Sequence, residues 1–396
     1  MTARAVDAAR AHDPFAPAQL GRATLRNRII KSATFEGRTP EGLVTDQLID
    51  FHRRFAAGGV GMTTLAYCAV SKDGRSAPGQ ITWDDEALPG LTKLTDAIHA
   101  EGAAVSAQIG HAGGVAPATV VGGRSLSPSR HFHPTALSFT RPVEEAEIRR
   151  VIDDHVRAAR RAVDCGFDVV EMHFGHGYLI SSFLSPRLNH RTDRWGGSLA
   201  NRARFALETA RAVRAEVGSE IAILAKVSMD DGKPGGFWVD EAIQLVKWLE
   251  EDGTVDGVVL TAGSSLENPL YTFRGDAPLR EFAALMPQPR KLGVKLVGQY
   301  FLRTYPYQDA YLLDLARQVR HAVDLPLVLL GGITGKESIE LAMTEGFDFV
   351  QMGRALLSDP NLIDTIQQEG AGQSLCIHCN KCMLSIYSGA RCVLRP

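Results

Sequence analysis

The stretch EEAEIRRVIDDHVRAARRAVDCGFDVVEMH, residues 144–173, contains a helical pattern followed directly by a strand pattern. Acidic residues occupy its first turn, where they favour the start of a helix, and Gly166 stands where that helix should end. The short run at residues 169–173 that follows predicts a β-strand. The stretch therefore predicts one helix–strand unit of a parallel sheet.

The same unit repeats along the chain. Short runs rich in Val, Ile and Leu alternate with amphipathic segments of helical length, and strands that are joined through helices run parallel. The strand candidates are residues 29–33, 62–67, 104–109, 169–173, 221–228, 257–262, 327–331 and 349–352. Eight βα repeats with strands buried on both faces predict an α/β fold, the (β/α)8 TIM barrel, rather than an open doubly wound sheet.

A ninth strand candidate, KLVGQYF at residues 295–301, has no helix of its own before it. We expect it to belong to an excursion between the sixth and seventh units, as part of a substrate loop. No low-complexity linker interrupts the chain, so we expect a single domain over residues 1–396, with an N-terminal arm at 1–25 and a cysteine-rich tail at 374–396.

Composition and charge indicate which ligands to expect. The chain is 45% hydrophobic and 22% charged, as is usual for soluble globular proteins, and its net charge of -2 gives no attraction for nucleic acid or an anionic membrane. The N-terminal residues lack the apolar core of a secretory signal, and no later run reaches the length of a membrane span. We expect a cytoplasmic protein that binds small-molecule substrates, and a homo-oligomer stays open.

A histidine pair and a tyrosine follow the fourth strand candidate. His173 ends that strand, and His176 and Tyr178 lie in the loop after it, where the active sites of barrels form. Two imidazoles can donate N–H bonds to a carbonyl oxygen, and a phenol can deliver a proton to a carbon atom. Two histidines three residues apart are equally typical of a metal site or a structural pair. The pair alone therefore leaves these alternatives open.

The longer stretch HGYLISSFLSPRLNHRTDRWGG, residues 176–197, resembles the signature of the Old Yellow Enzyme family of FMN-dependent oxidoreductases. The resemblance extends over nearly the whole chain, and the tail and the KSA strand are closest to the branch that contains 2,4-dienoyl-CoA reductases and trimethylamine dehydrogenase. It implies that His173 and His176 bind the carbonyl oxygen of an electron-poor alkene. It also implies that Tyr178 is the proton donor.

The segment RNRIIKSATF resembles the first strand and loop of that family. The resemblance implies that Ser32, Ala33 and Thr34 contact the flavin ring, and it places Tyr67 at the flavin as well. Phe35 falls where the family usually has Thr or Cys, which tunes the flavin potential. A phenyl ring cannot donate such a hydrogen bond. Either the potential of this protein differs or Phe35 packs in the core.

Two polar residues within apolar strands are also expected at the flavin. By the same resemblance, Gln108 in SAQIGHAG pairs with the pyrimidine edge of the ring. Lys226 interrupts the strand IAILAKVSMDD, and a buried lysine is costly without an anionic partner. The family has Arg there, beside the negative charge of the reduced ring, and Lys keeps that charge but loses the bidentate fork. A lysine that extends from a strand end to solvent is the alternative.

The segments LLGGIT and VQMGRAL end the seventh and eighth strand candidates. Barrels commonly hold a phosphate at these two loops through backbone N–H groups. The resemblance assigns Gly331, Gly332, Gly353 and Arg354 to the FMN phosphate, with Arg354 as a charge-assisted donor. Glycine is also common in any tight βα turn, but two such turns at these strands predict a phosphate site.

The tail CIHCNKCMLSIYSGARCVLRP contains Cys376, Cys379, Cys382 and Cys392. Thiols spaced so closely in a cytosolic protein predict a metal or redox site before a disulfide framework. In multidomain relatives of the family, four cysteines in this region hold a [4Fe–4S] cluster that serves a further flavin domain. Because the chain ends four residues after Cys392, we expect FMN to be the only redox cofactor and the thiols to be reduced. A cluster or a zinc ion is the alternative.

Together these observations predict an FMN-dependent ene-reductase. NADPH or NADH would supply a hydride, through the flavin, to the activated C=C bond of an α,β-unsaturated carbonyl compound. A dienoyl-CoA reductase-like enzyme or an N-demethylating flavin dehydrogenase is the alternative within enzymes. From a different class, a flavin-binding or electron-transfer module without turnover is the alternative, although His173, His176 and Tyr178 argue against it.

Overall fold

The computed structural model describes residues 12–133, 138–285, 291–292, 294, 298, 302–386 and 388–395. Its centre is a closed barrel of parallel strands in chain order: β3 (Ile29–Lys31), β4 (Met62–Ala69), β5 (Ala104–Gly110), β10 (Val169–Phe174), β11 (Ala222–Ser228), β12 (Gly257–Thr261), β13 (Leu327–Leu330) and β14 (Phe349–Met352). Each predicted strand is present, and no predicted boundary differs from the observed one by more than two residues. The predicted TIM barrel is confirmed.

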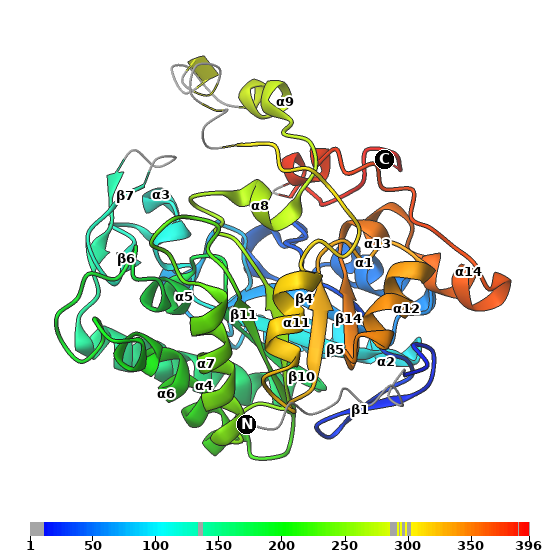
Figure 1. Ribbon diagram of the computed structural model, residues 1–396, viewed down its shortest axis with the longest axis horizontal. Helices are drawn as coiled ribbons and strands as arrows, with labels where there is room; N and C mark the ends of the chain where they lie inside the picture. Colours follow the sequence, from blue (N-terminus) through cyan, green and yellow to red (C-terminus); the bar gives the residue numbers. More distant parts are fainter. Residues whose placement is uncertain are drawn as a thin grey trace.

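Helices surround this barrel and connect its strands (Figure 1). The longer ones are α1 (Asp46–Ala57), α2 (Leu88–Ala100), α4 (Glu145–Asp164), α6 (Leu199–Val217), α7 (Val239–Glu251), α11 (Leu313–Arg320), α12 (Lys336–Thr344) and α14 (Leu362–Glu369). Shorter ones are α3 (Ala118–Val121), α5 (Leu179–Leu184), α8 (Pro269–Phe273), α9 (Leu279–Ala284), α13 (Arg354–Ser358) and the 3-10 turns η1 (Pro40–Gly42), η2 (Lys72–Gly74), η3 (Gly113–Val115) and η4 (Lys381–Leu384). Among the described residues, no helix combines the length and apolar character that crossing a bilayer requires.

Helix α4 and strand β10 form the unit predicted from residues 144–173. The Glu147 carboxylate accepts the backbone N–H of Glu144 at 3.0 Å and so satisfies one of the free donors at the helix start. The helix ends at Asp164, and Gly166 follows with φ 82°, a left-handed conformation that glycine adopts without strain. Local sequence therefore determines both ends of this helix.

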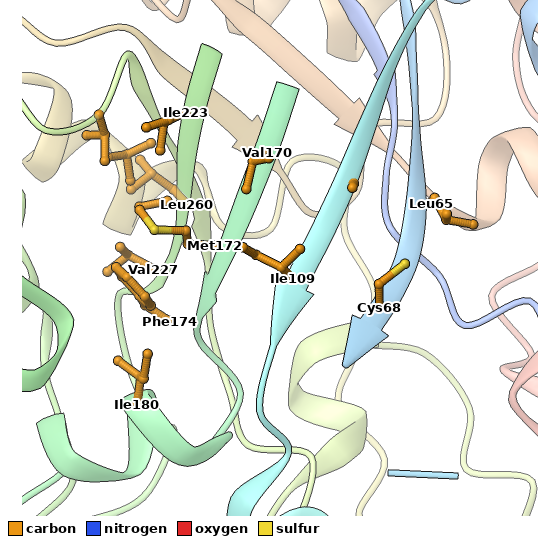
Figure 2. Packing of buried hydrophobic residues seen from close by; sticks show 14 of the residues in the cluster. Leu65, Cys68, Ile109, Val170, Met172, Phe174, Ile180, Ile223, Val227 and Leu260 are labelled. Carbon is orange, nitrogen blue, oxygen red and sulfur yellow. The ribbon is translucent and has the colours of Figure 1, made fainter. Parts of the chain in front are cut away.

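Alternation along β10 divides its side chains between two environments. Val170, Met172 and Phe174 pack against the surrounding helices, as Figure 2 shows together with Ile180 of α5. The intervening residues point to the barrel interior, where Val169 joins the apolar layer at the bottom. The next two interior positions on β10 are polar, Glu171 and His173, so the interior changes from apolar to polar toward the carboxyl ends of the strands.

The described part of the N-terminal arm closes the bottom of the barrel. Strands β1 (Ala18–Leu20) and β2 (Ala23–Leu25) form an antiparallel hairpin. Leu20 and Leu25 are fully buried against interior residues of the barrel such as Met62 and Phe349. The hairpin therefore covers apolar side chains that an open barrel end would expose to water.

The opposite end carries the long loops (Figure 1), with α8, α9 and the C-terminal segment above the strands and β1 below them. Two small pairs, β6 (Leu126–Ser127) with β9 (Arg141–Pro142) and β7 (Phe132–His133) with β8 (Ser138–Phe139), also lie outside the barrel. The expected excursion between the sixth and seventh strands contains α8 and α9. Most of the ninth strand candidate, 295–297 and 299–301, lies outside the described residues.

Candidate active site

The carboxyl ends of the strands surround a cavity of about 460 Å³, a volume typical of small-molecule sites, which span roughly 300–1,000 Å³. Every residue that the sequence suggested for catalysis or flavin binding lines this cavity: Ser32, Ala33, Thr34, Phe35, Tyr67, Gln108, His173, His176, Tyr178, Lys226, Gly331, Gly332, Gly353 and Arg354. Barrel closure thus brings together residues that lie far apart in the chain. Their roles toward a flavin stay predictions.

A buried carboxylate, Glu171, organises the polar floor of the site. Its oxygens accept hydrogen bonds from Gln108 Nε2 at 2.6 Å, Lys226 Nζ at 3.1 Å and Gln351 Nε2 at 2.8 Å. Lys226 Nζ also donates to Gln351 Oε1 at 3.0 Å. Lys226 is only 2% exposed. It does not extend to solvent, and its anionic partner comes from the neighbouring strand, because a buried charge needs a nearby counter-charge.

Sequence reasoning missed Glu171 and Gln351, although both carry the signal that identified Lys226. Each interrupts an apolar strand and is fully buried. The strand register places Glu171 beside Gln108 and His173 beside Lys226. Neighbouring interior positions of parallel strands therefore form this network, and only the register shows which polar groups meet.

The two histidines and the tyrosine lie together on the cavity wall. The ring of His173 is 5.0 Å from that of His176 and 4.4 Å from that of Tyr178, measured between centroids. Tyr178 also meets the edge of Tyr67 at 5.4 Å, and the Tyr67 hydroxyl donates to the carbonyl of Gly74. Such mutual contacts restrict the rotamers of all the rings involved and hold their polar atoms in place.

His176 adopts a left-handed backbone conformation, φ 59°, which is uncommon for a residue other than glycine. Several contacts hold it there. Its backbone N–H donates to Ser228 Oγ at 3.0 Å, and its carbonyl accepts the N–H of Ser265 at 2.9 Å. The ring Nε2 lies 2.8 Å from Thr261 Oγ1. Residues from β11, β12 and the following loop thus orient a histidine that comes from the β10 loop.

Both histidines are neutral at ordinary pH. Burial lowers the pKa of His176 to about 3, and the positive charge of Lys226 adds to the effect. Burial, with His176 and Lys226 as further causes, also lowers the pKa of His173 well below its usual range. Among the described residues, no group forms a hydrogen bond with the buried Nδ1 of His173. A neutral imidazole has one N–H donor, so each ring can present a single donor to a bound oxygen.

Strand β3 and the residues after it form another wall. Ser32 Oγ donates to Gln351 Oε1 at 3.1 Å, and Thr34 Oγ1 accepts a hydrogen bond from Lys31 Nζ at 2.8 Å. Lys31 is almost fully buried, and desolvation lowers its pKa to about 8. Phe35 lines the cavity, so it faces the site rather than packing only in the core. Lys31 is thus a second buried cation besides Lys226. Unlike Lys226, it was not predicted from the sequence.

The two glycine loops lie at the ends of β13 and β14. Gly331 and Gly332 have φ values of 101° and 80°, and a Cβ on Gly332 would lie 2.6 Å from the backbone nitrogen of Ala310. Glycine is therefore required there, whatever the loop binds. The Arg354 guanidinium donates to Asn380 Oδ1 at 2.6 Å, to the carbonyl of Arg274 at 2.9 Å and to that of Phe273. These bonds fix its charge at the edge of the cavity.

The C-terminal tail contributes to the same cavity. Cys376, His378 and Cys382 line it, and the ring of His378 stacks on Tyr307 at 3.3 Å. Burial raises the pKa of Cys376, and it raises that of Cys382 to about 11, so both are protonated thiols. Cys379 and Cys392 do not line the cavity. Among the described residues, no group of three His, Cys, Asp or Glu side chains is placed to hold a metal ion.

The cavity fits a flavin mononucleotide by its distribution of polar groups. Gln108 and Lys226 provide an amide and a cation at its floor, as the polar edge of the ring requires. Gly331, Gly332 and Arg354 provide the close backbone approach and positive charge that a phosphate requires. Apolar residues between these ends, including Ala33, Ala66 and Leu330, can pack on a flat ring.

Comparison with known proteins agrees with this geometry. Residues 13–263 match the model of the NADH:flavin oxidoreductase / NADH oxidase family. The chain belongs to this family. Family members are flavin-dependent NAD(P)H oxidoreductases, as expected from the sequence.

Individual relatives differ in what they reduce or oxidise. Over 96% of this chain and 94% of the other, the sequence is 51% identical to a 4,4'-dithiodibutanoate disulfide reductase of Rhodococcus erythropolis. It is 31% identical to an N,N-dimethylglycine/sarcosine dehydrogenase of Chromohalobacter salexigens, covering 95% of this chain and 51% of that one. A solved complex of 2-naphthoyl-CoA reductase has a TM-score of 0.82 and 28% identity, covering 98% of this chain and 57% of that one. The expected relationship to the acyl-CoA reductase and amine dehydrogenase branch is confirmed, and the chain spans about half the length of these two longer relatives.

Proposed function

We propose that this protein is an NAD(P)H-dependent ene-reductase that acts on the activated C=C bond of α,β-unsaturated carbonyl compounds. The observation that supports it is the convergence of His173, His176 and Tyr178 on one cavity that also contains Lys226. FMN bound in this cavity would supply the hydride chemistry that amino-acid side chains lack. The residues described above for its ring and phosphate would hold it.

The side chains of the cavity provide the remaining functions. The neutral rings of His173 and His176 donate hydrogen bonds to the substrate carbonyl and stabilise the negative charge that develops on its oxygen. The Tyr178 phenol gives a proton to the α-carbon, which completes the addition of one hydride and one proton. The apolar lining excludes water and strengthens each of these interactions.

The proposal is tested by measuring the reductive and the oxidative half-reactions of the Tyr178→Phe variant separately. Reduction of the bound flavin by NAD(P)H under anaerobic conditions should be nearly unchanged, because it needs no proton from the phenol. Reoxidation by 2-cyclohexenone should slow by about 10²-fold or more. Tyr305→Phe serves as a control, since Tyr305 is outside the residues that line the cavity. Equal losses in both half-reactions would show that Tyr178 is structural, and wild-type protein that reduces no enone would refute the proposal.

A small organic disulfide is the second candidate substrate. The 51% identity to a 4,4'-dithiodibutanoate disulfide reductase over nearly the full length of both chains favours it. In that reaction NAD(P)H and one proton supply two electrons and two protons, the S–S bond breaks, and two thiols form. The cavity could accept such a molecule, and its N–H donors and phenol could stabilise and protonate the leaving thiolate.

The two candidates are distinguished with one preparation of the enzyme. Wild-type protein is supplied with NADPH or NADH and either 2-cyclohexenone or 4,4'-dithiodibutanoate. Nucleotide oxidation is followed by absorbance, and released thiols are counted with a thiol-specific reagent. Two thiols per nucleotide, with no alkene reduction, would replace the ene-reductase proposal by the disulfide reductase. Formaldehyde release from N-methylated amines would instead support an N-demethylating dehydrogenase.

A further inference from the structure

A second concavity of about 670 Å³ opens beside the cavity described above. It is lined by segments from four loops, which contribute His131, Arg187, His190, Lys233 and Glu267. Leu266 lines both concavities, so they adjoin at this residue. Nothing in the proposed reaction uses these side chains.

The lining of this second concavity, which we call the basic pocket, carries an excess of positive charge. Among its described residues Glu267 is the single carboxylate, and Arg187 Nε binds it at 2.8 Å. Within the part of the chain that the structure describes, no carboxylate lies within ion-pair distance of Lys233. Two imidazoles, of His131 and His190, add further hydrogen-bonding groups. A site with these groups and little opposing charge attracts an anion.

The segment that carries Arg187 and His190 is held rigidly from behind. Asn189 Nδ2 donates to the carbonyls of Phe183 and Trp195, each at 2.8 Å. Arg191 Nη1 donates to the carbonyl of Val143 at 2.8 Å, and its guanidinium pairs with Asp193. The bonds of Asn189 and Arg191 therefore fix the backbone on either side of position 190. Preorganisation of this kind lowers the entropy cost of binding a ligand.

Consecutive residues of one loop also connect the catalytic histidines to the basic pocket. Ser264 forms a bridge with His176, and the N–H of Ser265 donates to the His176 carbonyl at 2.9 Å. Leu266 and Glu267 follow directly. A ligand that occupies the site at His176 therefore needs to extend only past Leu266 to reach Arg187 and Lys233.

We propose that the basic pocket binds the phosphates of the nicotinamide dinucleotide while its nicotinamide ring lies in the neighbouring cavity. This inference rests on the proposed function, because it assumes that NAD(P)H is the reductant. Pyrophosphate oxygens suit the Arg187 guanidinium, which can donate two parallel hydrogen bonds, and the Lys233 ammonium. Neither cation is needed to hold FMN, whose proposed phosphate site lies at Gly331, Gly332 and Arg354.

Charge reversal at the pocket provides the test. Lys233→Glu should weaken the binding of NADP⁺ and of NAD⁺ to the oxidised holoenzyme about tenfold or more, as measured by isothermal titration calorimetry. The Kd of the wild-type protein should rise with ionic strength, and this dependence should flatten in the variant. Lys247→Glu, the same change on the outer helix α7, is the matched control and should bind both nucleotides normally. Lys233→Gln, which removes the positive charge without adding a negative one, is measured in the same way if Lys233→Glu does not fold.

The reaction of the reduced enzyme with its electron acceptor shows whether the basic pocket binds the nucleotide or the acceptor. Reoxidation of dithionite-reduced Lys233→Glu by 2-cyclohexenone, which is neutral, should equal that of the wild type. The proposal fails if Lys233→Glu and Lys233→Gln bind both nucleotides like the wild type. It also fails if the variants weaken only the reaction with the dianion 4,4'-dithiodibutanoate, since the pocket would then serve an acidic acceptor. Wild-type protein that neither binds these nucleotides nor is reduced by NAD(P)H would instead refute the proposed function.

Discussion

At the scale of single residues, His155 shows how burial makes the stability of this protein depend on pH. It lies in α4, is fully buried and binds the carbonyl of Val151 through Nδ1 at 2.7 Å. No hydrogen-bond partner of its Nε2 is found among the described residues. Desolvation lowers its pKa to about 4, whereas a histidine in an unfolded chain has a pKa of about 6.5. The unfolded chain therefore binds a proton here more strongly than the folded protein.

We expect the free energy of unfolding to fall as the pH drops from about 6.5 toward 4, by up to ~1.4 kcal/mol per pH unit from His155 alone. Above pH 7 both states are deprotonated at this residue, so the effect vanishes. His155→Gln should make the decline shallower in urea unfolding curves at pH 7.5, 6.0 and 5.0. His99→Gln should make it steeper, because Asp168 raises the pKa of His99 and that stabilisation is present only at lower pH. Equal slopes in all three proteins would contradict this account.

At the scale of secondary-structure elements, the turn before η4 connects the tail to the cavity. Asn380 there has φ 54° and is almost fully buried. Its Nδ2 donates to the carbonyls of Asp276 at 3.0 Å and Arg274 at 3.3 Å, while its Oδ1 accepts from Arg354. One side chain thus joins the tail, the loop after α8 and the start of α13. The position of Arg354 depends on this junction.

Asn380→Ala should destabilise the protein by about 1–3 kcal/mol, because it leaves buried partners unsatisfied. It should also weaken the retention of FMN, because Arg354 loses an acceptor that orients it. Asn380→Gly removes the same bonds but tolerates the left-handed backbone, so the difference between the variants measures the conformational cost. Thermal unfolding and flavin release on dialysis provide the readouts. Ser388→Ala, an exposed change in the same tail, should leave both unchanged.

At the scale of the whole molecule, one end of the barrel contributes to stability and the other end contains the candidate active site. The hairpin of β1 and β2 seals one end with apolar side chains, and the cavity occupies the other. Leu25→Ala should therefore cost about 2–5 kcal/mol of stability through the space it leaves. The flavin spectrum and kcat should stay unchanged at temperatures where the variant is folded. Leu285→Ala, at a position 62% exposed, should cost less than about 0.5 kcal/mol. A Leu25→Ala protein of normal stability would show that the hairpin is dispensable.

The sequence by itself determined the barrel and the residues expected for catalysis and flavin binding, which all line the cavity but make up less than half of its lining. Apolar runs that alternate with amphipathic helices reflect local periodicity, which a chain displays before it folds. A histidine at the end of β10 or a glycine pair at the end of β13 is recognisable because its place in a βα unit specifies where it will lie. The resemblance to a flavin enzyme family then predicted what those residues would bind.

Only the tertiary structure decided which side chains meet. Glu171 and Lys226 are both visible as charges within apolar strands, but their pairing depends on the register of β10 against β11. The thiols of Cys376 and Cys382 reach the cavity because the tail folds back over the strands. Lys233 and Arg187 belong to different loops, and only the fold places both in the basic pocket. Such contacts join segments that are far apart in the sequence. Their separation along the chain does not predict the distance between them in space, which the closed barrel sets.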